Sequence, residues 1–223
     1  MESHSNLYAL IALSYASYFI ISNIYKLIKV NSLIDTLTSV KAFRLINIRH
    51  LSGIFFFGTG FWVYLPEFRF LIMNSGFSSA ISMFLLLIIA VLSGFFSRRD
   101  AVKYFGDLDT VSTVTPGDQI MYFSIRLPFL FFYELFFRGV LFHTSLVLTN
   151  LWSAILINLI LYILIHSFNS KKEIIGCIPF GIVLCLFSYY TNSIWPAFLI
   201  HAVLSFMYES TLFKITSFKT QKS

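Results

Sequence analysis

The sequence predicts an all-α protein, a bundle of helices that crosses a membrane about seven times. Three observations support this prediction. Of the 223 residues, 57% are apolar and only 12% are charged, whereas soluble domains are charged at about a quarter of their positions. Apolar runs long enough to span a bilayer recur along the chain. The Lys and Arg residues gather in the connections between these runs, so most of the surface is suited to lipid.

The spans follow from the length of the apolar runs, because a membrane helix needs about 20 mostly apolar residues, with a range of about 17 to 25. Seven segments are candidates: Leu7–Tyr25, Leu51–Leu65, Phe77–Phe96, Gln119–Phe137, Leu151–His166, Ile174–Tyr190 and Ile194–Phe213. The second and fifth are short, so six or eight spans remain open. The first is expected to be retained, because residues 1–6 carry no Lys or Arg of the kind that begins a signal peptide.

Basic residues fill every second connection between the candidate spans and are nearly absent from the others. The basic segments are 26–49, 97–118, 167–173 and 214–222. By the positive-inside rule, this alternation predicts a multi-pass protein of the plasma membrane, with its N-terminus outside and its C-terminus in the cytoplasm. It also explains the net charge of +6 without a nucleic-acid partner, so membrane lipid is the expected surroundings.

The chain divides best at the polar segment Thr110–Asp118, where Pro116-Gly117 interrupts any helix. We therefore expect N-terminal spans and basic loops over residues 1–115, a membrane core over residues 116–213, and a basic cytoplasmic tail over residues 214–223.

Polar residues inside the apolar runs are the most informative feature of the core. Glu134 and Arg138 lie four residues apart and share one helix face. An ionisable residue at mid-membrane costs roughly 2.5–3.5 kcal/mol, so the pair should face the bundle interior. An ion pair that only fixes helix packing remains an alternative. Arg126 is a second arginine that lies in no connection and also requires a local partner.

Two further polar pairs follow on later spans. Tyr162 and His166 share a face, and so do His201 and Ser205. A histidine at a helix end is often interfacial, and serine often serves helix packing, so each pair alone is weak. Together, however, one Glu, one Arg and two His on three successive spans predict a site, because Glu and His activate water or hold metal ions.

These residues resemble the CAAX-protease and bacteriocin-processing (CPBP, or Abi) family of intramembrane proteases. Its motifs are Glu-Glu-x-x-x-Arg, Phe-x-x-x-His and His-x-x-x-Asn/Asp, in that order. The matching residues here are Tyr133-Glu134 with Arg138, Tyr162 with His166, and His201 with Ser205. The resemblance covers about residues 116–213, a little under half of the chain.

The resemblance implies a role for each matched position. In such proteins the first Glu activates the attacking water, and the two histidines support it with or without a metal ion. His166 and His201 would keep these catalytic roles and could hold a divalent metal such as zinc. Glu134 and Arg138 would support the architecture, while the residue at Ser205 would help to stabilise the oxyanion.

Two departures from the family pattern affect the catalytic groups, and a third is milder. Tyr133 replaces the catalytic Glu, and a phenol with an unperturbed pKa near 10 holds its proton at pH 7. If the chain is an active peptidase, Glu134 would have to act as the base, although adjacent residues point about 100° apart around a helix. Ser205 replaces Asn and offers one donor fewer. Tyr162 for Phe is a milder change, but its hydroxyl needs a partner.

Two functions are therefore expected. The first is an intramembrane endopeptidase that cleaves peptide or membrane-protein substrates. The second is a family member without proteolysis that acts by binding, as a bacteriocin self-immunity protein or as a regulator of a membrane partner. Tyr133 favours the second, and the retained histidines favour the first. A small transporter or channel fits less well, because the chain lacks paired broken helices in two matching halves.

Overall fold

The computed structural model describes residues 2–30, 32–37, 40–77, 79–105, 114–167 and 171–220, and these contain helices and no strand. The helices are α1 (Glu2–Leu27), α2 (Leu33–Thr36), α3 (Val40–Phe68), α4 (Phe70–Met73), α5 (Ala80–Phe105), α6 (Pro116–Glu134), the π-helical segment η1 (Leu135–Leu141), α7 (Phe142–Leu148), α8 (Leu151–His166), α9 (Lys171–Thr191) and α10 (Trp195–Thr220). The predicted all-α class is confirmed.

Five of the described helices are long and apolar enough to cross a membrane. They cover Asn6–Leu27, Ala80–Lys103, Pro116–Leu148, Lys171–Thr191 and Trp195–Thr216. Of the two predicted spans called short, one is the 16-residue apolar helix α8 and the other lies within the 29-residue helix α3. The chain is therefore a polytopic membrane protein, and the exact number of spans stays a prediction.

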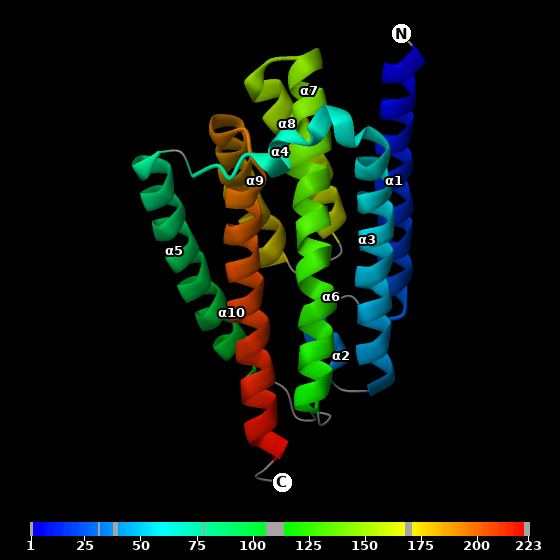
Figure 1. Cartoon of the computed structure of the whole chain (residues 1–223). Coiled ribbons are helices and arrows are strands. Elements are labelled where there is room, and N and C mark those ends of the chain that lie inside the picture. The colour runs from blue at the N-terminus through cyan, green and yellow to red at the C-terminus, as the bar shows by residue number, and fades with distance from the viewer. Residues whose placement is uncertain are drawn as a thin grey trace.

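The helices form one upright bundle, which Figure 1 shows with α1 and α3 on one side and α5 on the other. Helix α3 packs against both α1 and α6, and α5 packs along α10. Segments from before and after residue 115 thus share one bundle. Helix α10 runs on to Thr220, beyond the predicted start of the tail at residue 214. Residues 106–113 of the predicted boundary and 221–223 of the predicted tail lie outside the described residues.

The outer face of α5 is covered by large apolar side chains. Ile81, Phe84, Leu87, Val91 and Phe95 are all exposed. A continuous apolar surface of this kind marks contact with a membrane. The opposite side of the helix approaches α10 closely, because Gly94 lies against Val203 and Met207.

The start of α6 follows from local sequence chemistry. Thr115 is the N-cap: its hydroxyl oxygen accepts from the Asp118 backbone N–H at 3.2 Å, while its own backbone N–H donates to the Asp118 carboxylate at 3.0 Å. This reciprocal pair is a capping box, and Pro116 takes the first helical position, where a missing N–H costs nothing. The helix therefore begins at the break that the sequence predicts and carries Arg126, Tyr133 and Glu134 into the bundle.

Helix α8 is short and ends at about mid-height of the bundle, as Figure 1 shows. It begins at Asn150, whose side-chain oxygen accepts from the Ser153 N–H, and it ends at His166. Because the helix stops early, His166 lies at the end of its helix yet inside the bundle, where it is partly buried. This placement brings His166 to the level of residues on α6 and α10.

Candidate active site

Glu134 is the last residue of α6 and has no exposed surface. Its Oε1 atom lies 2.5 Å from Nδ1 of His201, and its Oε2 atom lies 3.3 Å from Nε of Arg138. The predicted contact between Glu134 and Arg138 is confirmed as an ion pair, although its geometry falls short of a hydrogen bond. Both carboxylate oxygens are therefore engaged, one by each neighbour.

Arg138 is also completely buried, and it lies in the π-helical segment η1. Its guanidinium group stacks over the Tyr162 ring, 4.2 Å from the ring centroid. A cation over an aromatic face is stabilised by the ring's quadrupole, most strongly where water is excluded. Tyr162 and Arg138 therefore link α8 to the helix that carries Glu134.

Each of the two histidines has its Nδ1 atom close to an oxygen atom of another residue. Nδ1 of His166 lies 2.9 Å from the Tyr162 carbonyl oxygen. Because a carbonyl only accepts, that Nδ1 carries the proton and leaves Nε2 as an acceptor. Nδ1 of His201 faces the Glu134 carboxylate in the same way. Both imidazoles are thus oriented by an oxygen partner behind them.

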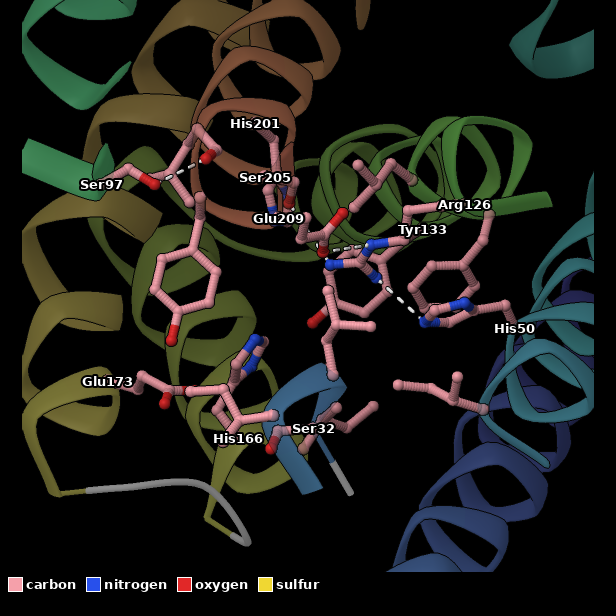
Figure 2. Close-up of a pocket in the computed structure, with 18 of the residues that line it drawn as sticks. Ser32, His50, Ser97, Arg126, Tyr133, His166, Glu173, His201, Ser205 and Glu209 are labelled. Carbon is pink, nitrogen blue, oxygen red and sulfur yellow. Dashed lines mark hydrogen bonds and ion pairs between the residues drawn. The ribbon is translucent and has the colours of Figure 1, made fainter. Parts of the chain in front are cut away.

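Tyr133 lies beside these two histidines, and Figure 2 shows all three side chains at the same cavity. Its ring centroid is 5.9 Å from that of His201 and 6.2 Å from that of His166. The side chain is buried, and its hydroxyl has no hydrogen-bond partner among the described residues. A phenol thus stands where the family motif has its first carboxylate.

These three residues line a cavity of about 710 Å³ between α3, α6, α8, α9 and α10. Glu134 is not among the described residues of its wall, although Tyr133 beside it is. The difference follows from the helix, because adjacent side chains point about 100° apart. The four-residue helix α2 also borders the cavity, through Ser32, Leu33, Ile34 and Asp35.

A second polar group lies in the same cavity, and we call it the Arg126 cluster (His50, Arg126, Ser205 and Glu209). Nε of Arg126 donates to the Glu209 carboxylate at 2.9 Å, and its two terminal nitrogens lie 3.3 Å from Nε2 of His50 and 3.3 Å from Oγ of Ser205. Glu209 is therefore the local partner that the sequence required for Arg126.

Two members of this cluster, His50 and Glu209, were not predicted from the sequence. His50 was overlooked because it adjoins the basic connection that ends at Arg49, yet it is buried inside α3. Glu209 follows Ser205 by four residues and His201 by eight, so the helical period of α10 could have revealed it. The structure brings six of the predicted site residues into one group of contacts: Tyr133, Glu134, Arg138, Tyr162, His166 and His201. The seventh, Ser205, lines the same cavity but contacts Arg126. The chemical roles of all seven stay predictions.

The predicted zinc site at His166 and His201 meets one requirement and lacks another. Two imidazoles whose Nδ1–H groups are held by oxygen partners are oriented as zinc ligands usually are. However, zinc sites use at least three protein ligands. In the described part of the chain no three His, Cys, Asp or Glu residues converge in this way. The side chains present thus do not form a complete zinc site.

Comparison with known proteins identifies the core of the bundle. Residues 119–207 match the family described as "Type II CAAX prenyl endopeptidase Rce1-like". No curated protein and no solved structure gave a significant match. The matched segment contains Tyr133, Glu134, Arg138, both histidines and Ser205, in the order and on the helices described above. The match confirms, for this segment, the resemblance to the CAAX-protease family that the sequence motifs indicate.

Proposed function

We propose that the chain uses its CAAX-protease fold to bind a peptide segment of a membrane partner in the cavity, without hydrolysing it. The observation that carries this proposal is the pair of neighbours Tyr133 and Glu134. The phenol lines the cavity, whereas the carboxylate is fully buried behind it. The cavity wall between the two histidines thus offers a weak acid in place of a base.

Peptide hydrolysis by activated water needs a group that accepts a proton near neutral pH. A phenol with an unperturbed pKa near 10 is protonated there. Glu134 could replace it only by leaving His201 and Arg138, whose contacts occupy both of its oxygens. Such a move would leave the buried Arg138 without its counter-charge, which is strongly unfavourable. Two residues therefore disfavour proteolysis: Tyr133 is a poor base, and Glu134 is held by His201 and Arg138.

The cavity itself supports binding of a peptide. Its volume of about 710 Å³ lies within the range of about 300–1,000 Å³ typical of ligand sites. Apolar residues such as Phe129, Leu130 and Phe180 line it together with polar ones. The Nε2 atom of His166 is an acceptor that suits a peptide N–H group. A self-immunity protein against a membrane-active peptide, or a regulator of a membrane partner, would use such a site.

The second candidate is an intramembrane endopeptidase, and the two histidines favour it. Both line the cavity, and both are oriented by an oxygen atom behind Nδ1. In this function Glu134 would act as the base through His201, and the substrate would be a peptide or a membrane protein.

For either function we place the chain in the plasma membrane, with its N-terminus outside and its C-terminus in the cytoplasm. The alternation of basic and non-basic connections along the sequence supports this orientation.

The deciding experiment compares newly formed membrane-protein termini in cells that carry the native chain, His201→Ala, Tyr133→Glu, Tyr133→Gln or Tyr133→Glu/His201→Ala. We expect products only with Tyr133→Glu, because it restores a carboxylate between the histidines. Tyr133→Gln is the matched control of equal size without a base. Products from the native chain that disappear in His201→Ala would overturn the proposal and establish the endopeptidase.

Binding is tested separately with a photo-crosslinking residue in place of Phe180, which lines the cavity. The control carries the same residue in place of Ile20, which is exposed on α1. A peptide adduct is expected at position 180 and not at position 20. Equal yields at both positions would count against the cavity as the binding site.

A further inference from the structure

The π-helical segment η1 changes the hydrogen-bond partner of one backbone carbonyl. In an α-helix the Phe142 N–H would donate to the Arg138 carbonyl oxygen, four residues earlier. Here it is directed to the carbonyl oxygens of Phe137 and Gly139, so it passes over that of Arg138. A buried carbonyl needs a hydrogen-bond partner, and Arg138 is completely buried. Its oxygen is therefore open to a donor from another helix.

Ser188 of α9 supplies this donor. Its Oγ atom donates to the Arg138 carbonyl oxygen at 2.8 Å, and its side chain has no exposed surface. Because its single proton is used in this way, the same Oγ atom accepts from Nε2 of His143 at 3.3 Å. His143 follows Arg138 by five residues, which is the span of one π turn. Ser188 thus binds both ends of the wide turn with one hydroxyl group.

Asn158 of α8 binds the preceding carbonyl. Its Nδ2 atom donates to the Phe137 carbonyl oxygen at 2.5 Å. Sγ of Cys185 donates to Oδ1 of the same amide at 3.4 Å, and this contact orients the amide with its nitrogen toward η1. Asn158 has no exposed surface. Two neighbouring carbonyls of the wide turn are therefore bound by polar side chains from two other helices.

The wide turn determines where the Arg138 side chain points. Arg138 lies inside η1, which begins directly after Glu134. Because a π turn takes one residue more than an α turn, it changes by up to about 100° the direction of the residues that follow. In the observed turn, Nε of Arg138 lies 3.3 Å from the Glu134 carboxylate, and its guanidinium group lies over the Tyr162 ring. The position of the ion pair thus depends on how η1 is held.

We propose that Ser188 and Asn158 are positioning residues, which hold η1 in its π form and thereby place Arg138 against Glu134 and Tyr162. Neither residue belongs to the described wall of the cavity, so they act through the backbone of η1 and not by contact with a ligand. This role is independent of whether the cavity binds or cleaves a peptide. Wide turns of this kind are frequent at functional sites.

The first test measures the rotation of α7 in the full chain in detergent. Spin labels are attached at Ile20 on α1 and at Val147 on α7, which are both exposed. Because Val147 lies beyond η1, loss of the π form would turn its label around the helix axis. We expect Ser188→Ala/Asn158→Leu to add a second distance between the labels, shifted by several ångströms. Ser188→Thr keeps the hydroxyl group and should keep the native distance.

The second test measures the ion pair itself, by thermal unfolding of the same chains. Glu134→Gln should lower the melting temperature of the native chain, because it leaves the buried Arg138 without its counter-charge. In the Ser188→Ala/Asn158→Leu background it should lower the melting temperature by no more than about half as much, because the two groups are already displaced. Ser188→Ala alone serves as the background if the double variant does not fold.

Deletion of Val140 gives the opposite prediction for Ser188. It removes the extra residue of the wide turn, so the His143 N–H would reach the Arg138 carbonyl as in an α-helix. Ser188→Ala should then lower the melting temperature less than it does in the full-length chain.

Two outcomes would overturn the inference. In the first, Ser188→Ala/Asn158→Leu lowers the melting temperature but leaves the label distance and the effect of Glu134→Gln unchanged, which would mean that both residues only pack. In the second, Ser188→Ala costs as much with Val140 deleted as with Val140 present, which would mean that the hydroxyl group does not serve the wide turn.

Discussion

His201 and Glu134 are 67 residues apart in the sequence, yet Nδ1 of the imidazole lies 2.5 Å from Oε1 of the carboxylate. This contact joins α10 to α6 in the interior of the bundle. It fixes which nitrogen of His201 carries a proton, and it takes one oxygen of the only buried carboxylate in the family's first motif.

Glu134→Gln should destabilise the protein by about 3–5 kcal/mol, because it leaves the fully buried Arg138 without its counter-charge. Thermal unfolding in detergent measures the effect. The matched control is Glu134→Gln/Arg138→Met, which removes both charges and should recover most of the loss. If Glu134→Gln has the same melting temperature as the native chain, the ion pair contributes nothing to stability.

Zinc should raise the melting temperature of Tyr133→Glu and leave that of the native chain unchanged. The substitution adds a carboxylate beside two imidazoles that already present Nε2, which gives the three ligands of a zinc site. A ligand bound only by the folded state stabilises it in proportion to the logarithm of its concentration. Tyr133→Gln is the control, and an equal zinc effect in that variant would show that the metal binds elsewhere.

Gly53→Ala should weaken the packing of α3 against α6. A Cβ atom at this position would lie 2.3 Å from Cε2 of Phe129 and 2.9 Å from Cε2 of Tyr18. Overpacking of this kind costs about 1–3 kcal/mol. The control is Gly176→Ala, where a Cβ would meet no atom within 4 Å and where alanine favours the helix. If the two variants have the same melting temperature, the close approach of α6 to α3 at Gly53 does not contribute to stability.

The Lys172–Asp100 ion pair at the cavity wall should contribute little to stability. Nζ of Lys172 lies 2.5 Å from Oδ1 of Asp100, but the two side chains are 55% and 38% exposed. Exposed pairs are worth about 0.2–1 kcal/mol and are screened by salt. A double-mutant cycle with Lys172→Gln and Asp100→Asn measures the coupling. A coupling energy above about 2 kcal/mol that persists in 1 M salt would contradict this expectation.

The fold class could be predicted from the sequence because a membrane imposes a simple requirement. Every spanning backbone group must find its partner inside the segment, so long apolar runs become helices. The three motif pairs could be placed for the same reason, since each lies on a single helix and follows its period. That the three helices bring these pairs to one cavity depends on tertiary packing, and only the resemblance to a family predicted it.

Other features could not be predicted, for physical reasons. The level of His166 within the bundle depends on how far α8 extends, and hydropathy does not measure that depth. The partnership of Arg126 with His50 and Glu209 depends on which faces of α3 and α10 turn inward. The π-helical segment Leu135–Leu141 contains strongly helix-forming residues as well as Gly139, and nothing in its composition distinguishes it from an α-helix.

That π-helical segment allows for a change in chain length. A π turn accommodates one residue more than an α turn, and it begins directly after Glu134. Deleting one residue between 139 and 141 would let the backbone return to α-helix, and the side chains after the segment would keep nearly the same faces, because the wide turn already absorbs one extra residue. The same deletion in the α-helical residues before Glu134 would rotate every later side chain by about 100°. A deletion of one residue should therefore be tolerated better here than in α6.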